Sequence, residues 1–188
     1  MLLEYHDHIV LDGEPIRIIN SHKKYIVALK VLRSTEIFDE DKVETVLPLL
    51  FEDPSEIPIG REQDALVAFF DLFSDKKKSE KTAPSFDIVQ DCDFVFSGFM
   101  QTYGIDLDEK DMKIEKFIAL LKGLPSDTRL AEIIKIRTMP IPQKTKYNAQ
   151  QIADIMKAKN EFALEKNSFA KSIGSFGKMI KEWANNGR

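Results

Sequence analysis

Hydrophobic and polar residues recur with two different periods along this chain of 188 residues, and the period changes near residue 20. Before that point, the segment HIVLDGEPIRII (8–19) holds two β-rich runs around the pair Asp12-Gly13. Such a pair adopts the positive φ angles of a tight hairpin turn. Pro15 cannot donate a ladder hydrogen bond, so its strand is expected at a sheet edge. The start of the chain therefore predicts a β-hairpin.

After residue 20, hydrophobic residues recur at steps of three and four, which is the spacing of one face of a helix. Ser21 is the expected N-cap of a first helix and Asp39 that of a second, which Pro48 should kink or shorten. A third helix is expected over residues 61–73. Its buried stripe consists of Leu66, Phe69, Phe70 and Phe73.

Four further helices are predicted between residues 85 and 165, with short polar residues as N-caps and glycines at some ends. Their expected starts are Ser85, Asp108, Ser126 and Asn148, and the first two are expected to end at Gly104 and Gly123. The last of the four carries an apolar stripe of Ile152, Ile155, Met156 and Phe162.

The helix expected after Ser85 has an acidic residue among its apolar positions. Asp93 falls on a stripe that contains Phe86, Val89, Phe96, Met100 and Tyr103. A buried carboxylate needs a hydrogen-bonding or charged partner. We therefore expect Asp93 at the margin of the core or paired with a buried donor, rather than in a catalytic role.

These elements predict a mainly α fold. We expect a compact helical domain of about seven helices with a small N-terminal β-hairpin over residues 1–164, followed by a C-terminal amphipathic helix in residues 165–188.

The C-terminal helix has an aromatic-rich stripe, and its lysines lie away from the centre of that stripe. Gly174 and Gly177 each weaken an isolated helix by up to about 1 kcal/mol, so the segment needs a surface on which to order. Its own domain, a second copy, a client protein and a membrane surface all remain possible. The candidate protein-binding residues are Phe169, Ile173, Phe176, Ile180 and Trp183.

Composition limits the class of protein. Hydrophobic residues make up 43% and charged residues 31% of the chain, which is typical of neither a disordered nor a membrane protein. The N-terminal segment MLLEYHDHIV lacks the pattern of a signal peptide. Cys92 is the only cysteine, which excludes an internal disulfide and suits a reducing cytoplasm. We therefore expect a protein that stays in the cell where it is made.

Charge is distributed unevenly. The net charge is −4, yet residues 144–188 contain nine Lys/Arg and only four Asp/Glu, so the remainder of the chain is strongly acidic. An acidic body repels phosphates, and we expect no nucleic-acid partner.

No residue pattern points to catalysis, a cofactor or a metal. The segment 106–117 resembles a calcium loop, but Lys110 occupies a ligand position and Phe117 replaces the bidentate glutamate. His6 and His8 would share a strand face, but no further ligand lies nearby, so we expect a solvent-facing pair. The surface carboxylates carry no pattern that separates catalytic acids from idle ones. The expectation is a protein that is not an enzyme.

Two motifs resemble a known family. FxxxYGIDL (99–107) is followed at a short distance by FIALLKGLPSDTRLAEIIKIR (117–137), and INSHKKYIVALKVL and MKAKNEFAL flank them in the same order. This arrangement, over roughly residues 8–164, resembles a family of proteins from long-tailed bacteriophages of Gram-positive hosts. Their genes lie between those of the major tail protein and the tape measure protein. Family members usually carry a tryptophan pair where this chain has Ile114 and Glu115.

The resemblance implies a tail assembly chaperone, a non-catalytic protein of the host cytoplasm that coats the tape measure protein until the tail tube polymerises around it. The major tail protein and a second copy of the chain are further possible partners, and no membrane is involved. A structural tail component, such as a connector or completion protein, is the alternative. A regulatory nucleic-acid-binding protein is a third possibility, supported only by the basic C-terminus.

Overall fold

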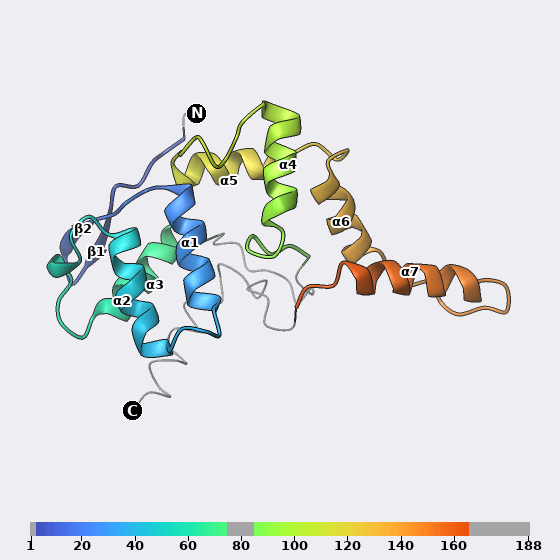
Figure 1. The fold of residues 1–188 in the computed structure, drawn as a ribbon, viewed down its shortest axis with the longest axis horizontal. Helices are drawn as coiled ribbons and strands as arrows, with labels where there is room; N and C mark the ends of the chain where they lie inside the picture. The colour runs from blue at the N-terminus through green and yellow to red at the C-terminus, as the bar shows by residue number, and fades with distance from the viewer. Residues whose placement is uncertain (1–2, 75–84, 166–188) are drawn as a thin grey trace.

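The structure, a computed structural model, describes residues 3–74 and 85–165 (Figure 1). These residues form seven α-helices, a short 3-10 helix at Pro54–Glu56 and one two-stranded sheet. The predicted mainly α fold with an N-terminal hairpin is therefore confirmed. The expected C-terminal helix, with its stripe of Phe169, Ile173, Phe176, Ile180 and Trp183, lies outside the described residues.

The hairpin forms where the sequence predicts it. Strand β1 (His8–Leu11) pairs antiparallel with β2 (Glu14–Arg17), and the turn residues Asp12 and Gly13 have φ angles of 53° and 92°. One face of this sheet is buried, and Ile9 lies opposite Ile16 on it. The alternation of buried and exposed side chains fixes the register, because a slip of one strand by one residue would turn its isoleucine to solvent.

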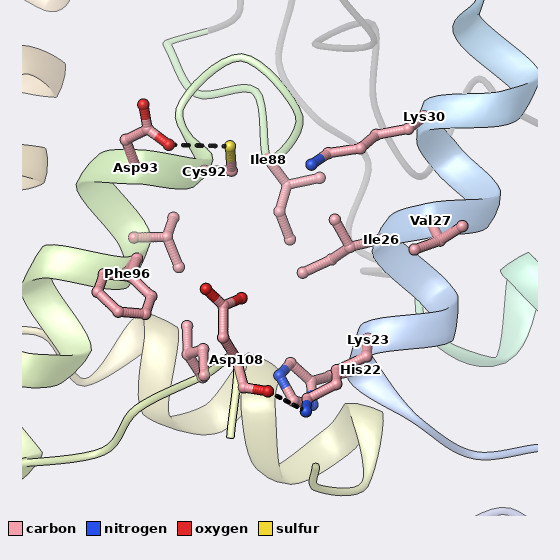
Figure 2. Close-up of a pocket in the computed structure, with 12 residues that line it drawn as sticks. His22, Lys23, Ile26, Val27, Lys30, Ile88, Cys92, Asp93, Phe96 and Asp108 are labelled. Carbon is pink, nitrogen blue, oxygen red and sulfur yellow. Dashed lines mark hydrogen bonds between the residues drawn. The ribbon is translucent and has the colours of Figure 1, made fainter. Parts of the chain in front are cut away.

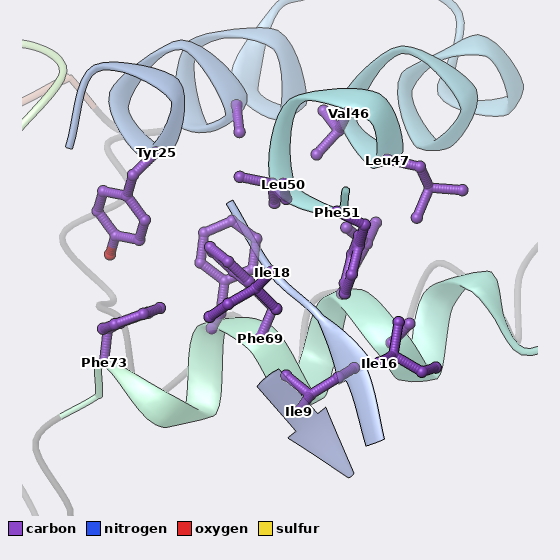
Figure 3. Close-up of a cluster of buried hydrophobic side chains, with 14 of the residues drawn as sticks. Ile9, Ile16, Ile18, Tyr25, Val46, Leu47, Leu50, Phe51, Phe69 and Phe73 are labelled. Carbon is purple, nitrogen blue, oxygen red and sulfur yellow. The ribbon is translucent and has the colours of Figure 1, made fainter. Parts of the chain in front are cut away.

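The hairpin packs with three helices around the larger of two hydrophobic clusters (Figure 3). The helices are α1 (His22–Arg33), α2 (Asp39–Leu50) and α3 (Glu62–Leu72). The predicted stripe of α3 is confirmed, because Leu66, Phe69, Phe70 and Phe73 are all buried. Burying each such side chain contributes about 1.5–3 kcal/mol to the hydrophobic driving force for folding.

Two predictions about α1 and α2 have different outcomes. The hydroxyl of Ser21 accepts a hydrogen bond from the Lys24 amide, which confirms the N-cap of α1. The expected cap of α2 was wrong by one residue, because Phe38 is the N-cap and Asp39 is already helical. Pro48 lies in the last turn of α2, and the helix ends two residues later. At this position the missing N–H of proline removes a single helical hydrogen bond.

Three helices surround the second hydrophobic cluster. They are α4 (Cys92–Tyr103), α5 (Ile114–Lys122) and α6 (Arg129–Thr138). The buried residues of this cluster are Val95, Phe99, Leu107, Phe117 and Leu130. The side chains of Ile26, Ile88 and Ile118 pack against both clusters and so connect them. A seventh helix, α7 (Ala149–Glu161), projects from the rest of the protein at its N-terminal end and contacts α6 near its C-terminal end (Figure 1).

Three predicted helix starts were wrong, and for two of them local side-chain hydrogen bonds hold the chain in a turn or cap it nearer the observed start. The helix expected after Ser85 starts at Cys92, that expected after Asp108 starts at Ile114, and that expected after Ser126 starts at Arg129. Before α5, the carboxylate of Asp106 accepts hydrogen bonds from the amides of residues 108 and 109. Before α6, the hydroxyl of Thr128 caps the helix by accepting from the Ala131 amide.

The predicted helix ends are mostly correct. Gly104 ends α4 in the left-handed conformation, with φ of 61°, as expected for a glycine cap. Gly123 ends α5 with φ of −88°, so this cap does not use the freedom of glycine. Asn148 is the N-cap residue of α7 as predicted, but its carboxamide makes no capping bond to the helix.

Candidate functional site

A groove lies between α1 and α4 (Figure 2). Its volume is about 590 Å³. Lys23 and Lys30 stand on the α1 side, and Asp93 and Asp108 on the side of α4. The apolar part of the lining combines α1, α4 and the segments flanking α4, and consists of Ile26, Val27, Ile88, Val95, Phe96 and Leu107. An apolar floor between two charged rims suits an amphipathic segment of another protein.

Contacts of His22 fix the start of α1 at one end of the groove. This side chain is buried and stacks on Phe117, with ring centroids 5.1 Å apart. Its Nδ1 lies 2.9 Å from Oδ1 of Asp111. Partial burial opposes ionisation of Asp111, but hydrogen bonds from Ser21, the Met112 amide and His22 outweigh it and lower the pKa of the carboxyl. No local sequence pattern marks His22, since its partners lie about ninety residues further along the chain.

Buried ion pairs hold the opposite end of the groove together. Asp87 and Asp91 precede α4, and both carboxylates are inaccessible to solvent. Arg33 at the end of α1 donates to Asp87 at 2.8 Å. Arg137 of α6 forms a two-pronged pair with Asp91, with N···O distances of 2.7 and 2.8 Å. These pairs join α1, α4 and α6, and therefore set the distance between the groove walls.

Asp93, the acid that the sequence pattern marks, is not one of the buried carboxylates. Asp93, expected at the margin of the core or paired with a buried donor, is exposed on the rim of the groove. The buried stripe of α4 passes instead through Val95 and Phe99, and Met100 is turned toward solvent. Phe96 and Tyr103 of the expected stripe lie at the margin of this buried face, where they pack against the second cluster.

A third polar cluster attaches the N-terminal segment to α5. The carboxylate of Glu115 accepts from the His6 amide at 2.7 Å and from the Asn20 side chain at 2.9 Å, while Asn20 accepts from the Ile114 amide. Burial, which by itself raises the pKa of Glu115, is outweighed by these hydrogen bonds, so the pKa is lowered. Ile114 is fully buried. Ile114 and Glu115, where the resembled family usually carries tryptophans, thus join α5 to the larger cluster.

The two N-terminal histidines have separate partners. His6 bonds to Glu115, whereas Nδ1 of His8 lies 2.6 Å from a carboxylate oxygen of Asp7. Both rings are partly exposed, but they do not form a shared site. Within residues 3–74 and 85–165, no group of three or more His, Cys, Asp or Glu side chains is placed to hold a metal ion.

Two groove side chains with reactive heteroatoms, Cys92 and His22, have defined surroundings. Burial raises the pKa of the Cys92 thiol, and the adjacent carboxylate of Asp93 acts in the same direction. A raised pKa keeps the sulfur in its weakly nucleophilic thiol form. The His22 ring, the imidazole that lines the groove, is engaged by Asp111.

Helix α7 provides a second apolar surface. None of its residues is buried, and Met156 is 49% exposed. The predicted stripe of Ile152, Ile155, Met156 and Phe162 therefore lies on this helix and the residue after it without becoming core. In the described parts of the chain, no helix is long and apolar enough to cross a bilayer.

Comparison with known proteins identifies a family. Residues 5–164 match the sequence model of the family described as Bacteriophage Gp15 protein. No curated protein and no solved structure matches the chain. The matched region contains every helix and strand of the described structure.

Proposed function

This chain belongs to the Bacteriophage Gp15 protein family, and from that premise we propose that it is a non-catalytic tail assembly chaperone that binds the tape measure protein during tail morphogenesis in the host cytoplasm. The groove between α1 and α4 is the proposed client site. The major tail protein and a second copy of this chain are further candidate partners, whereas nucleic acid and membranes are not expected.

The groove supports this proposal because its chemistry suits an amphipathic client helix. A tape measure protein is a long helical chain that must be kept from aggregating before the tube surrounds it. Helix-in-groove recognition places the apolar face of such a helix on an apolar floor. Ile26, Phe96 and Leu107 form part of such a floor, and Lys30 and Asp93 on opposite rims can pair with charges beside the client stripe.

The test is co-expression of the chain with its tape measure protein. Val27 lines the groove and is 45% exposed, so Val27→Glu places a charge in the client site without disturbing the core. Val10→Glu is the matched control, because Val10 is 61% exposed on the hairpin, away from the groove. We expect the native chain and Val10→Glu to raise the soluble yield of the client and to elute with it, and Val27→Glu to do neither.

Two outcomes would count against the proposal. If the native chain neither raises the yield nor forms a complex, the chaperone function is wrong. If Val27→Glu retains the client as well as Val10→Glu does, the groove is not the client site.

A structural role in the tail is the second candidate, and α7 favours it. This helix extends from the body with Ile152, Ile155 and Met156 partly or largely exposed, as expected of an arm that packs into a permanent assembly. Mass spectrometry of purified phage particles separates the two functions. A chaperone is absent from the particle, whereas a connector or completion protein is present in fixed copy number.

A further inference from the structure

We propose that residues 166–188 of this chain occupy the groove between α1 and α4 when no client is bound. The segment would then act as an internal substitute for the client helix and would leave the groove when the client arrives. The role of the client rests on the function proposed above, but occupation of the groove by the segment is a property of the isolated chain and is tested without a client.

The described chain ends beside the groove. The backbone of residues 163–165 is held by Gln90, whose side chain donates to the Ala163 carbonyl at 3.0 Å and accepts from the Glu165 amide at 3.0 Å. The Glu165 carboxylate also pairs with Arg33 at 3.2 Å. Gln90 lies two residues before Cys92, and Arg33 lies one turn beyond Lys30, and both of these neighbours line one end of the groove. The described chain therefore ends at Glu165, close to one end of the groove.

The length and shape of the segment fit the space. At about 1.5 Å per residue, α1 is about 18 Å long and residues 166–183 would form a helix of about 27 Å, enough to cover the groove from end to end. An apolar cavity of about 150 Å³ in another protein holds one benzene ring, so the groove volume of about 590 Å³ has room for roughly four rings, more than the stripe requires. The stripe supplies three aromatic side chains, those of Phe169, Phe176 and Trp183.

Charge also favours this occupant. Residues 166–188 contain four lysines and one arginine against one glutamate, whereas the whole chain is negative, so the segment is attracted to the acidic body that precedes it. The lysines lie away from the centre of the stripe and would remain in solvent after docking. A tethered segment also has an effective concentration in the millimolar range. Residues 166–188 of the same chain therefore compete for the groove more effectively than the same segment of a second copy does.

The intact chain carries a reporter for this test. Cys92 is its only cysteine and lines the groove, so a docked segment slows alkylation by N-ethylmaleimide. The disrupting variant is Ile173→Glu/Phe176→Glu, which places two charges on the stripe. The control is Ser175→Glu/Asn185→Glu, which adds the same charge away from it. Trp183, the only tryptophan, reports docking independently through its emission wavelength.

We expect the stripe variant to be alkylated about tenfold faster than the native chain, which corresponds to a docking free energy of about 1.4 kcal/mol. The control should react at the native rate, and Trp183 emission should shift to the red only in the stripe variant. Far-UV circular dichroism verifies that the body stays folded. Val27→Glu, which alters the groove instead of the segment, should accelerate alkylation in the same way, and Val10→Glu should not.

Three results would overturn the proposal. Equal rates in the native chain and the stripe variant would show that the groove is open. Equally fast alkylation of the control variant would show that the added charge, and not loss of the stripe, accounts for the faster reaction. Protection that disappears on dilution would assign the groove to a second copy.

Discussion

Replacing Arg137 by methionine should destabilise the protein more than any surface substitution. Arg137 is only 6% exposed, and its guanidinium donates to both oxygens of Asp91 and to the carbonyls of Phe162 and Ser85. Methionine keeps much of the side-chain volume but none of these donors. It leaves the fully buried carboxylate of Asp91 with the Asp87 amide, at 3.0 Å, as its remaining donor.

The expected loss follows from that uncompensated charge. Removing one partner of a buried ion pair costs about 3–5 kcal/mol. For a chain of this size, each 1 kcal/mol lowers the melting temperature by about 2–4 °C, so we expect a decrease of about 10 °C. Guanidinium titration and thermal melting, both followed by circular dichroism, measure the two quantities. Arg17→Met is the control, because Arg17 pairs with Glu52 at 3.6 Å on the surface and such pairs contribute about 0–1 kcal/mol.

A double-mutant cycle with Asp91→Asn isolates the pair. Once Arg137 is absent, an uncharged side chain at position 91 should restore part of the lost stability, so the double variant should cost less than the sum of the single variants by well over 0.5 kcal/mol. If Arg137→Met costs less than about 1 kcal/mol, or if the two losses add within about 0.5 kcal/mol, the pair does not hold α4 to α6 as inferred here.

Three further predictions concern other polar and backbone features. Tyr25→Phe should stabilise the protein by about 1 kcal/mol, because the buried Tyr25 hydroxyl has no hydrogen-bond partner among the described residues. Tyr103→Phe should destabilise it by a similar amount, since that hydroxyl donates to a carbonyl of α5 at 2.9 Å; urea titrations giving the same sign for both would contradict the assignment. The lowered pKa of Glu115 means that its contribution to stability is complete above pH 4.5, its ordinary value, and is lost as the pH falls through the folded-state pKa. Stability measured from pH 6 to pH 3 should therefore fall less steeply in Glu115→Gln, and an unchanged slope would exclude this role. Gly104→Ala should cost about 1–2 kcal/mol by chemical denaturation, because φ is 61° there, whereas Gly123→Ala avoids that backbone strain at φ of −88°.

Much of the fold was predictable from local chemistry. Asp12-Gly13 adopts a tight turn, Ser21 caps the helix that follows it, and Gly104 ends α4 in the left-handed conformation. The aromatic stripe of α3 also follows from spacing alone. Each of these features depends on interactions within about four residues of the chain, and such interactions are present in the sequence pattern itself.

The candidate site was not predictable in the same way. The walls of the groove come from α1 and α4, which are separated by two helices, and no pattern indicates that these two helices face each other. Asp108 looks like an N-cap, but α5 begins six residues later because the Met112 carbonyl accepts the amide of His22. Asp93 is the acid that falls on the apolar spacing of this region, whereas nothing in the spacing marks Asp87 and Asp91 as the buried ones.

The sequence by itself therefore determined the types of the elements, most of their apolar faces and the membership of the family. The tertiary structure alone decided which acids are buried and where the groove lies. The reason is the distance along the chain between partners: 46 residues separate Asp91 from Arg137, and 109 separate His6 from Glu115. A carboxylate is stable in the interior only when a distant cation or amide reaches it, and that pairing exists only after the helices have packed.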